Sequence, residues 1–267
     1  MTRTQLSSLL EFAVETANSA GKLTLETFQK QQLTEIKEDG SIVTATDKKV
    51  EQFVRDQIRT YYPDHNILGE EYGQNNQSEG HYRWIVDPID GTESYVNGVP
   101  LYAVLVALEI DGESRIGVAH FPALNYTLYA AAGMGCFFNG NRVLVDDSIT
   151  AIQDAIVTIT DLKTLVKSPL PSSLDNLISQ AKIARGWGDA YGYFLVACGR
   201  TALHFDAVMK VWDCAPFLPI MTEAGGYFGD WNGNRTIYCE SSMATTKKLL
   251  PQVLEFLKED KRISNKN

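Results

Sequence analysis

Two aspartates stand three positions apart where an apolar run of the sequence ends. The stretch WIVDPIDGTESYV, residues 84–96, puts Asp87 after the apolar residues 84–86 and Asp90 just beyond Pro88. Pro88 cannot donate to a central strand ladder, so we expect the buried strand to end at Asp87 and a turn to bring Asp90 back beside it. Two such carboxylates repel each other unless a cation or a proton lies between them.

The residue types around this pair favour a hard cation. Carboxylate oxygens with no neighbouring His or Cys favour Mg²⁺ or Mn²⁺ over zinc, and the spacing of an EF-hand is absent. Gly91 and Thr92 follow, and N–H groups at the start of a helical turn there can hold a phosphate oxygen. A metal beside such amides is a hydrolytic arrangement, because the metal lowers the pKa of a bound water. From the residues alone, a structural turn explains the pattern equally well.

Three further acidic positions belong with this pair, and each also has a structural interpretation. Asp47 closes SIVTATD, a predicted short strand, and is a plausible N-cap for the helix predicted over 48–62. Glu70, in NILGEEYG, follows another short strand and can be a solvated loop carboxylate. Asp213 precedes CAPFLPI and can cap the next helix.

Alternating helix and strand patterns predict the elements that must position these acids. An amphipathic helix is predicted from the N-terminus towards Phe28, followed in the first half by strands over 101–110, 114–122 and 125–133, with a turn-rich segment at 133–143. The second half predicts strands over 155–159, 182–189, 203–208 and 236–242, and helices over 190–200, 214–226 and 245–260. This alternation indicates a layered α/β or α+β architecture with helices covering two sheets.

Composition narrows the classes of partner. The chain has 267 residues and a formal net charge of −9, and no Lys/Arg run is longer than two, which argues against a nucleic-acid partner. A bound divalent cation would offset the repulsion of a small anionic substrate. The apolar run YAVLVAL is far shorter than the ~20 residues that span a bilayer. With four separated cysteines and no signal-peptide pattern, we expect reduced thiols in a cytoplasmic protein.

Three motifs carry a resemblance to a known family. GEEYG, WIVDPIDGTESYV and VWDCAPFLPIMTEAGG together resemble the inositol monophosphatase-like family of Mg²⁺-dependent, lithium-sensitive phosphatases, in the right order across essentially the whole chain. The resemblance implies a layered αβαβα sandwich of the α/β (α+β) class, as in fructose-1,6-bisphosphatase. It implies one phosphatase domain over 1–267, with a metal-rich half at 1–150 and a substrate-binding half at 151–267. It also implies a homodimer with two to three Mg²⁺ per chain, Mn²⁺ as a substitute and Li⁺ as an inhibitor.

The same resemblance assigns the site residues. The metal ligands would be the carboxylates of Glu70, Asp87, Asp90 and Asp213 and the backbone carbonyl of Ile89, with Asp47 at the position of a weaker additional metal. Glu70 and Thr92 would orient and help deprotonate the attacking water. The amides of Gly91 and Thr92 would bind the phosphate. The implied activity is hydrolysis of a small phosphomonoester without a phosphoenzyme.

A second pair of motifs points to one branch of the family. RGWGDAYGYFLVACGR and FDAVMKVWDCAPFLPI are similar to histidinol-phosphatases, which implies L-histidinol phosphate as substrate. Asp189 and Asp206 could pair with its ammonium group, and Arg185 completes the predicted substrate-binding set. The alternatives are that Asp189 caps the following helix, that the substrate is inositol 1-phosphate or another sugar phosphate, or that the chain binds metal and ligand without turnover. Trp187, Tyr191 and Tyr193 could stack on imidazole or belong to the core.

Overall fold

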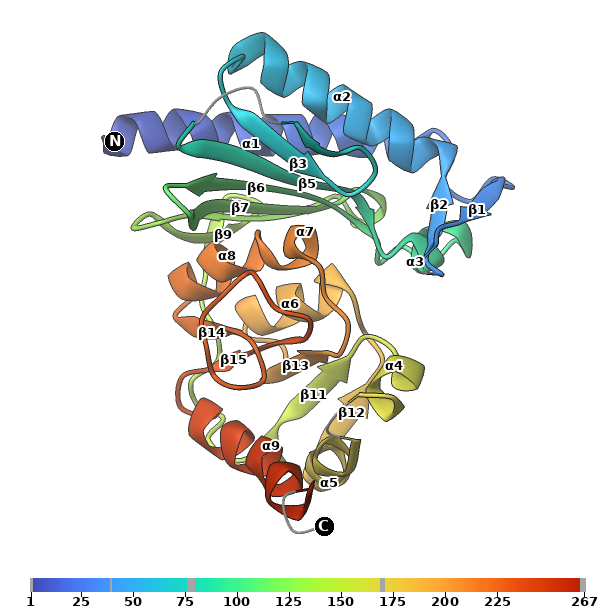
Figure 1. Cartoon of the computed structure of the whole chain (residues 1–267). Helices are drawn as coiled ribbons and strands as arrows, with labels where there is room; N and C mark the ends of the chain where they lie inside the picture. Colours follow the sequence, from blue (N-terminus) through green and yellow to red (C-terminus); the bar gives the residue numbers. More distant parts are fainter. Residues whose placement is uncertain (1, 39, 76–79, 169–170, 265–267) are drawn as a thin grey trace.

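Five layers make up the fold. A computed structural model describes residues 2–38, 40–75, 80–168 and 171–264. Figure 1 shows two long helices above a large sheet, short helices below it, then a smaller sheet and further helices beneath that. This arrangement confirms the predicted αβαβα sandwich. Among the described residues, no helix is both long enough and apolar enough to cross a membrane.

The large sheet has eight strands in the order β10-β9-β8-β7-β6-β5-β3-β4, and only the β3–β5 pair is parallel. Their bounds are β3 Asn66–Gly69, β4 Gly73–Asn75, β5 Tyr82–Asp90, β6 Ala103–Ile110, β7 Glu113–Phe121, β8 Tyr126–Ala131, β9 Gly135–Phe138 and β10 Asn141–Val143. A short 3₁₀ turn, Pro122–Leu124, joins β7 to β8. The hairpin β9–β10 lies in the segment that the sequence indicated only as turn-rich, because these strands are short and flanked by glycine and asparagine.

Two helices cover the outer face of this sheet. Helix α1, Arg3–Leu25, begins with a capping box between Thr2 and Gln5, and its apolar stripe packs with α2 on outward residues of β5 and β6. Helix α2, Ala45–Tyr61, follows a two-stranded hairpin of β1, Thr34–Ile36, and β2, Ile42–Thr44. The N-cap of α2 is Thr44, so the prediction that Asp47 is the cap is wrong. Asp47 instead accepts the Thr44 N–H at 2.8 Å as the third residue of the helix.

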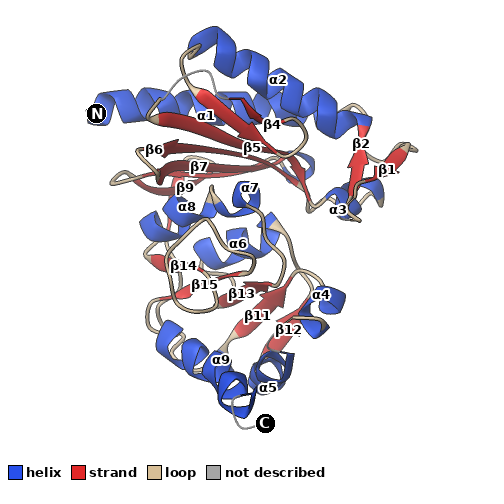
Figure 2. Ribbon diagram, viewed as in Figure 1, coloured by secondary structure: helices blue, strands red, loops and turns tan. Residues whose placement is uncertain are grey.

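The smaller sheet has five strands in the order β12-β11-β13-β15-β14, with β12, β11 and β13 parallel and the other pairs antiparallel (Figure 2). Their bounds are β11 Ile156–Ile159, β12 Ile183–Arg185, β13 Leu203–Asp206, β14 Gly226–Gly229 and β15 Ser242–Thr246. The middle layer contains α6 Ala190–Ala197, α7 Val211–Cys214 and α8 Phe217–Glu223. The remaining helices are α3 Thr92–Val96, α4 Leu162–Val166, α5 Pro171–Gln180 and α9 Leu250–Ser264, with a 3₁₀ turn at Ile152–Asp154.

Two strand predictions need correction. Strand β5 does not end at Asp87 but continues to Asp90, because a register shift between these two residues lets Pro88 sit in a bulge where no ladder hydrogen bond is needed. The strand predicted over 236–242 is also misplaced. The strand is β15, which begins at Ser242 and lies fully buried between β13 and β14, while 236–241 is a loop.

A buried ion pair on α2 fixes the turn that follows β3. The Glu51 carboxylate accepts hydrogen bonds from the Arg55 Nε at 2.7 Å and from the backbone N–H groups of Glu71 at 2.6 Å and Tyr72 at 3.2 Å. Both charged side chains are almost completely buried. Gly69 permits this approach, because a Cβ there would lie 2.0 Å from the Glu51 Oε1. The turn that carries Glu70 is therefore positioned from the outer helical layer.

We expect Glu51→Ala to lower the free energy of unfolding by about 3–5 kcal/mol, because it removes the carboxylate partner of the buried Arg55 guanidinium and leaves two backbone N–H groups without their acceptor. Urea denaturation followed by circular dichroism measures this. The matched control is Glu113→Ala, which breaks the exposed pair with Arg115 and should cost under ~1 kcal/mol. Equal losses in the two variants would contradict the anchoring role of Glu51.

Candidate active site

The predicted site residues meet at a cavity of about 730 Å³ between the large sheet and the middle layer. Loops and element ends far apart in the sequence line it, including the β1–β2 loop, the end of β3, the end of β5 and the starts of α6 and α7. Nine of the predicted residues line this cavity: Glu70, Asp87, Ile89, Asp90, Gly91, Thr92, Asp189, Asp206 and Asp213. Two do not, Asp47 and Arg185.

The end of β5 supplies the first two carboxylates. Side chains alternate along a strand, so Asp87 shares the inner face with Ile85, which belongs to the core between the sheets. The bulge then adds residues without lengthening the ladder, and Asp90 comes back to the same side. The Ile89 N–H donates to Asp87 Oδ1 at 3.0 Å, and the Ala190 N–H at the start of α6 donates to Asp90 Oδ2 at 2.7 Å.

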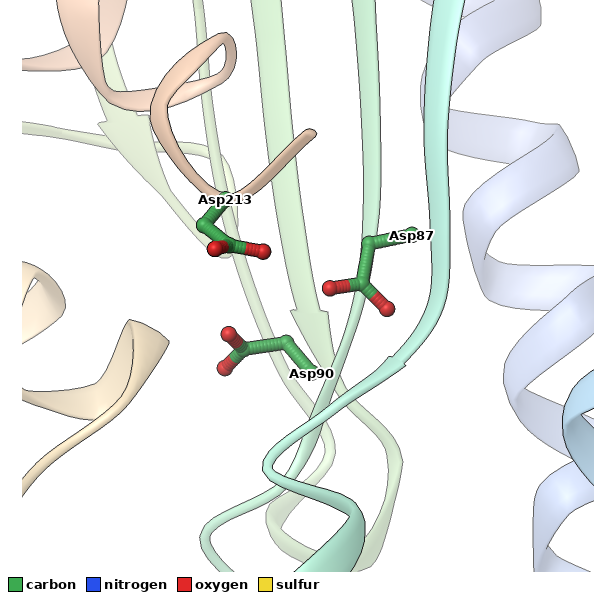
Figure 3. Close-up of side chains that lie close together, drawn as sticks. All are labelled: Asp87, Asp90 and Asp213. Carbon is green, nitrogen blue, oxygen red and sulfur yellow. The ribbon is translucent and has the colours of Figure 1, made fainter. Parts of the chain in front are cut away.

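Helix α7 supplies the third carboxylate from the other half of the chain. Asp213 lies in this single turn, and its Oδ2 accepts the Lys210 N–H at 2.7 Å. Oxygens of Asp87, Asp90 and Asp213 all lie within 4.8 Å of one another. In Figure 3 the three carboxylates point into a common space between β5 and α7. A set of three oxygen donors with no nitrogen or sulfur ligand among them fits a hard divalent cation.

Burial and mutual repulsion govern the protonation of this cluster. Burial raises the pKa of Asp87 well above its usual value, and the charges of Glu70, Asp90 and Asp213 raise it further. Burial also raises the pKa of Asp90 well above its usual value, and it raises the pKa of Asp213 to about 8. The three carboxylates therefore release their protons less readily than free aspartates, and a bound cation would favour their ionised forms.

Lys37 is a cavity residue that the sequence analysis missed. It lies in the β1–β2 loop, where its Nζ contacts Glu70 Oε1 at 2.7 Å and Glu71 Oε1 at 2.6 Å. Burial lowers the pKa of Lys37, but the hydrogen bonds to the two glutamates raise it more, so the group stays charged. Its partners are more than 30 residues away, and only the fold brings them together. The one local signal was a lysine between the predicted first helix and the predicted strand SIVTATD.

Asp47 lies behind the cavity and contacts it through Thr92. The Asp47 side chain is completely buried, and burial raises its pKa. The Thr92 hydroxyl lies 3.3 Å from Asp47 Oδ1 and 3.0 Å from the Ile89 carbonyl oxygen. Thr92 begins α3 as predicted, preceded by Gly91 at φ 78°, a left-handed conformation that favours glycine.

A second pair of acids, Asp189 and Asp206, lines the same cavity beside the three-aspartate cluster. Asp206 is buried at the end of β13 and Asp189 is half-buried before α6. The Thr160 hydroxyl bridges them, since it donates to Asp206 Oδ2 at 2.7 Å and accepts the Asp189 N–H at 3.0 Å. Burial raises the pKa of Asp206 to about 6, and burial together with the Asp206 charge raises that of Asp189 to about 7.

The interpretation of Asp189 as a helix cap is not supported. Asp189 occupies the N-cap position of α6 but its side chain makes no capping hydrogen bond, and Asp90 accepts the Ala190 N–H instead. Arg185 is exposed at the end of β12, where its guanidinium donates to the Ala184 carbonyl at 2.7 Å, so the chain does not bring it to the cavity. Of the three aromatic residues, only Tyr193 lines the cavity.

Comparison with known proteins decides the family. A match to the "Inositol monophosphatase family" covers residues 5–261. The chain belongs to the inositol monophosphatase family. A histidinol-phosphatase from Chlorobaculum parvum is 42% identical over 229 residues, which cover 85% of this chain and 88% of that protein. A histidinol-phosphatase from Mycobacterium tuberculosis is 34% identical over 250 residues, 92% and 96% of the two chains.

Family members also share the fold in solved structures. The IMPase structure from Thermotoga maritima superimposes on this family member with a TM-score of 0.86 and 27% identity, covering 96% of this chain and 99% of that one. The family membership makes the chain a phosphatase of small phosphate esters. The acidic cluster is then a metal-site candidate within a family of phosphatases.

We expect the thermal stability of protein in EDTA to fall as pH rises from 6.5 to 8.5. The folded-state pKa values of Asp189, about 7, and Asp213, about 8, exceed the unfolded value of about 3.9. The folded protein therefore binds more protons than the unfolded chain in this pH range, and its free energy of unfolding falls as these two carboxyl groups ionise. The pH range begins at 6.5 because burial lowers the pKa of His120 to about 4 and that of His204 to about 3. Below pH 6.5 these two histidines make the protein more stable as pH rises, which opposes the effect of the carboxyl groups.

Mg²⁺ should raise the melting temperature more at pH 8.5 than at pH 6.5, because it binds the ionised carboxylates. Differential scanning fluorimetry with EDTA and with excess Mg²⁺ measures both effects. As a control, Asp147→Asn changes an exposed acid outside the cavity and should preserve the pH dependence of the Mg²⁺ effect. Melting curves whose Mg²⁺ shift is the same at both pH values would contradict carboxylate binding.

Proposed function

We propose that the chain is a Mg²⁺-dependent phosphomonoesterase that hydrolyses L-histidinol phosphate to L-histidinol and phosphate. The observation that carries the proposal is one cavity lined by two neighbouring groups of acids. The cluster of Asp87, Asp90 and Asp213 forms its metal end, and the pair Asp189 and Asp206 lies beside that cluster. A substrate that is anionic at its phosphate and cationic at its ammonium group matches this layout when metal neutralises the three-aspartate cluster.

At the metal end, the carboxylates of Glu70, Asp87, Asp90 and Asp213 and the carbonyl of Ile89 would hold Mg²⁺. The bound ions would lower the pKa of the attacking water and stabilise the leaving oxygen. The cluster is held by backbone N–H groups at one oxygen of each aspartate, which leaves other oxygens to face the cavity. Mg²⁺ prefers such oxygen donors, and Mn²⁺ is the substitute that the same donors favour.

The residues after the bulge would handle the phosphate and the water. The N–H groups of Gly91 and Thr92, at the start of α3, would donate to phosphate oxygens. Thr92 would accept a hydrogen bond from the attacking water while its own hydroxyl donates to Asp47, whose carboxylate is already oriented by Thr44. Glu70 would take the water's proton, and its contact with Lys37 would hold the carboxylate in position.

Beside the metal end, Asp189 and Asp206 would bind the ammonium group of the amino alcohol. A charge-assisted hydrogen bond there is worth about 1.5–3 kcal/mol. The high identity to a histidinol-phosphatase, 42%, supports this substrate. The second candidate, inositol 1-phosphate, would use the same metal end, and the family name is the observation that favours it, but it has no cation for Asp189 and Asp206 to bind.

The proposal is tested by phosphate release from L-histidinol phosphate and from inositol 1-phosphate, each with Mg²⁺ and with EDTA. We expect a higher kcat/KM for L-histidinol phosphate and no turnover in EDTA. Asp87→Asn removes a metal ligand and should lower both rates on the order of 10²–10³-fold. A much higher kcat/KM for inositol 1-phosphate would contradict the proposed substrate. Full activity of Asp87→Asn would contradict the proposed metal site.

Asp189→Asn should lower kcat/KM for L-histidinol phosphate roughly 10- to 100-fold and leave that for a neutral polyol phosphate nearly unchanged, because only the first substrate carries the cation. Steady-state kinetics on the two substrates measures the difference, with the polyol phosphate as internal control. An equal loss on both substrates would mean that Asp189 supports the structure of the site and does not bind the ammonium group of the substrate.

A further inference from the structure

Two cysteines that are 25 residues apart face each other beside the candidate metal cluster. Cys214 ends α7 and directly follows Asp213, while Cys239 lies in the loop between β14 and β15. Their Sγ atoms are 3.7 Å apart, and both are free thiols. Cys214 is completely buried and Cys239 is half-buried, so Cys239 is the more accessible residue of the pair.

We propose that Cys214 and Cys239 are an oxidative modification site, at which a reversible disulfide displaces Asp213 and weakens cation binding. The inference rests on the proposed function only where it predicts a loss of phosphatase activity. Formation of the disulfide and its effect on cation binding can be measured without any substrate.

The chemistry of the pair follows from exposure and hydrogen bonding. The half-buried Cys239 is the first to react, and a hydrogen bond from the Cys214 thiol lowers its pKa from the usual value. With hydrogen peroxide as oxidant, the Cys239 thiolate attacks one oxygen, the O–O bond breaks, and a sulfenic acid and hydroxide form. The Cys214 sulfur then attacks the Cys239 sulfur, the S–O bond breaks, and the departing hydroxide takes the thiol proton as water. Two thiols lose two electrons in total, and one peroxide becomes two waters.

The surroundings determine which side moves when the bond forms. Residues on both sides of Cys239 are held: the Tyr238 hydroxyl donates to the Glu109 carboxylate, and the Met209 N–H donates to the Glu240 carbonyl at 2.8 Å. Cys214 ends a helix of a single turn, where its N–H donates to the Lys210 carbonyl at 3.2 Å and the next carbonyl, of Ala215, accepts the Ser114 hydroxyl at 2.6 Å. Because both sides are held, we expect the two sides to share the movement, so that α7 also shifts towards the loop.

The shift is large enough to matter for the cluster. A disulfide has an S–S length of about 2.05 Å, so the two sulfurs must approach by roughly 1.7 Å from their separation of 3.7 Å. Asp213 is the adjacent residue of the same turn, and its carboxylate lies within 4.8 Å of those of Asp87 and Asp90. Displacements near 1 Å at a reacting centre can cost about 10²-fold in rate.

The experiment treats the full chain with hydrogen peroxide and then with dithiothreitol. Non-reducing peptide mass spectrometry should find the Cys214–Cys239 link. The rise in melting temperature caused by Mg²⁺ should shrink by at least half, the phosphatase rate should fall at least tenfold, and dithiothreitol should restore both. Cys239→Ser should be active and resistant to peroxide. Cys198→Ser, which removes another half-buried thiol, should be active and still sensitive.

Each contrary result is distinct. Peroxide treatment that oxidises Cys198 but leaves no Cys214–Cys239 link would overturn the proposal, as would a link that changes neither the Mg²⁺-induced shift nor the rate. Equal peroxide sensitivity of Cys239→Ser and the unchanged chain would also overturn it. If the reduced protein hydrolyses no phosphomonoester, the proposed function fails, and the link and the Mg²⁺-induced shift still decide this inference.

Discussion

Repulsion among buried carboxylates is the constraint on which the site depends. Asp87, Asp90 and Asp213 lie within 4.8 Å of one another in a partly dry environment, an arrangement that costs free energy unless protons or cations are present. At each of the three residues, a main-chain hydrogen bond offsets part of that free-energy cost. A backbone N–H donates to one oxygen of every aspartate, from Ile89, Ala190 and Lys210 respectively. The carboxylates are thus oriented by the main chain and not by a basic side chain, which leaves their charge available to a cation.

The site also joins the two halves of the chain. Asp87 and Asp90 come from the large sheet, whereas Asp213 and the N–H that holds Asp90 come from the middle helices. The apolar core between the sheets, which includes Ile85, Phe194 and Phe217, keeps these layers in contact. Burial of that core supplies the free energy that brings like charges together, so packing far from the cavity maintains its electrostatics.

Periodicity predicted the layered architecture, α1 and the central meander, because these depend on local patterns. The nine residues that line the cavity were predicted as a set only through motifs that resemble the family. The predicted end of β5 was wrong, because the local sequence does not distinguish a proline in a bulge from a proline that follows a strand. The sequence placed the last strand at 236–242, where β-prone residues stand, although the small buried residues of β15 fit between β13 and β14. Lys37 and Arg185 show the limit most clearly: whether a charged side chain reaches a cavity depends on long-range packing that no local pattern encodes.

The contact between Glu51 and Gly69 has a consequence for how this chain can change in evolution. A side chain at position 69 would need the space that the Glu51 carboxylate occupies, and that carboxylate holds the turn bearing Glu70. The two positions therefore constrain each other. A larger residue at position 69 requires a shorter acid at position 51, or another side chain there that can hold the turn. Substitutions at these two sites should therefore appear together among descendants, although one lies in the outer helical layer and the other beside the turn that carries Glu70.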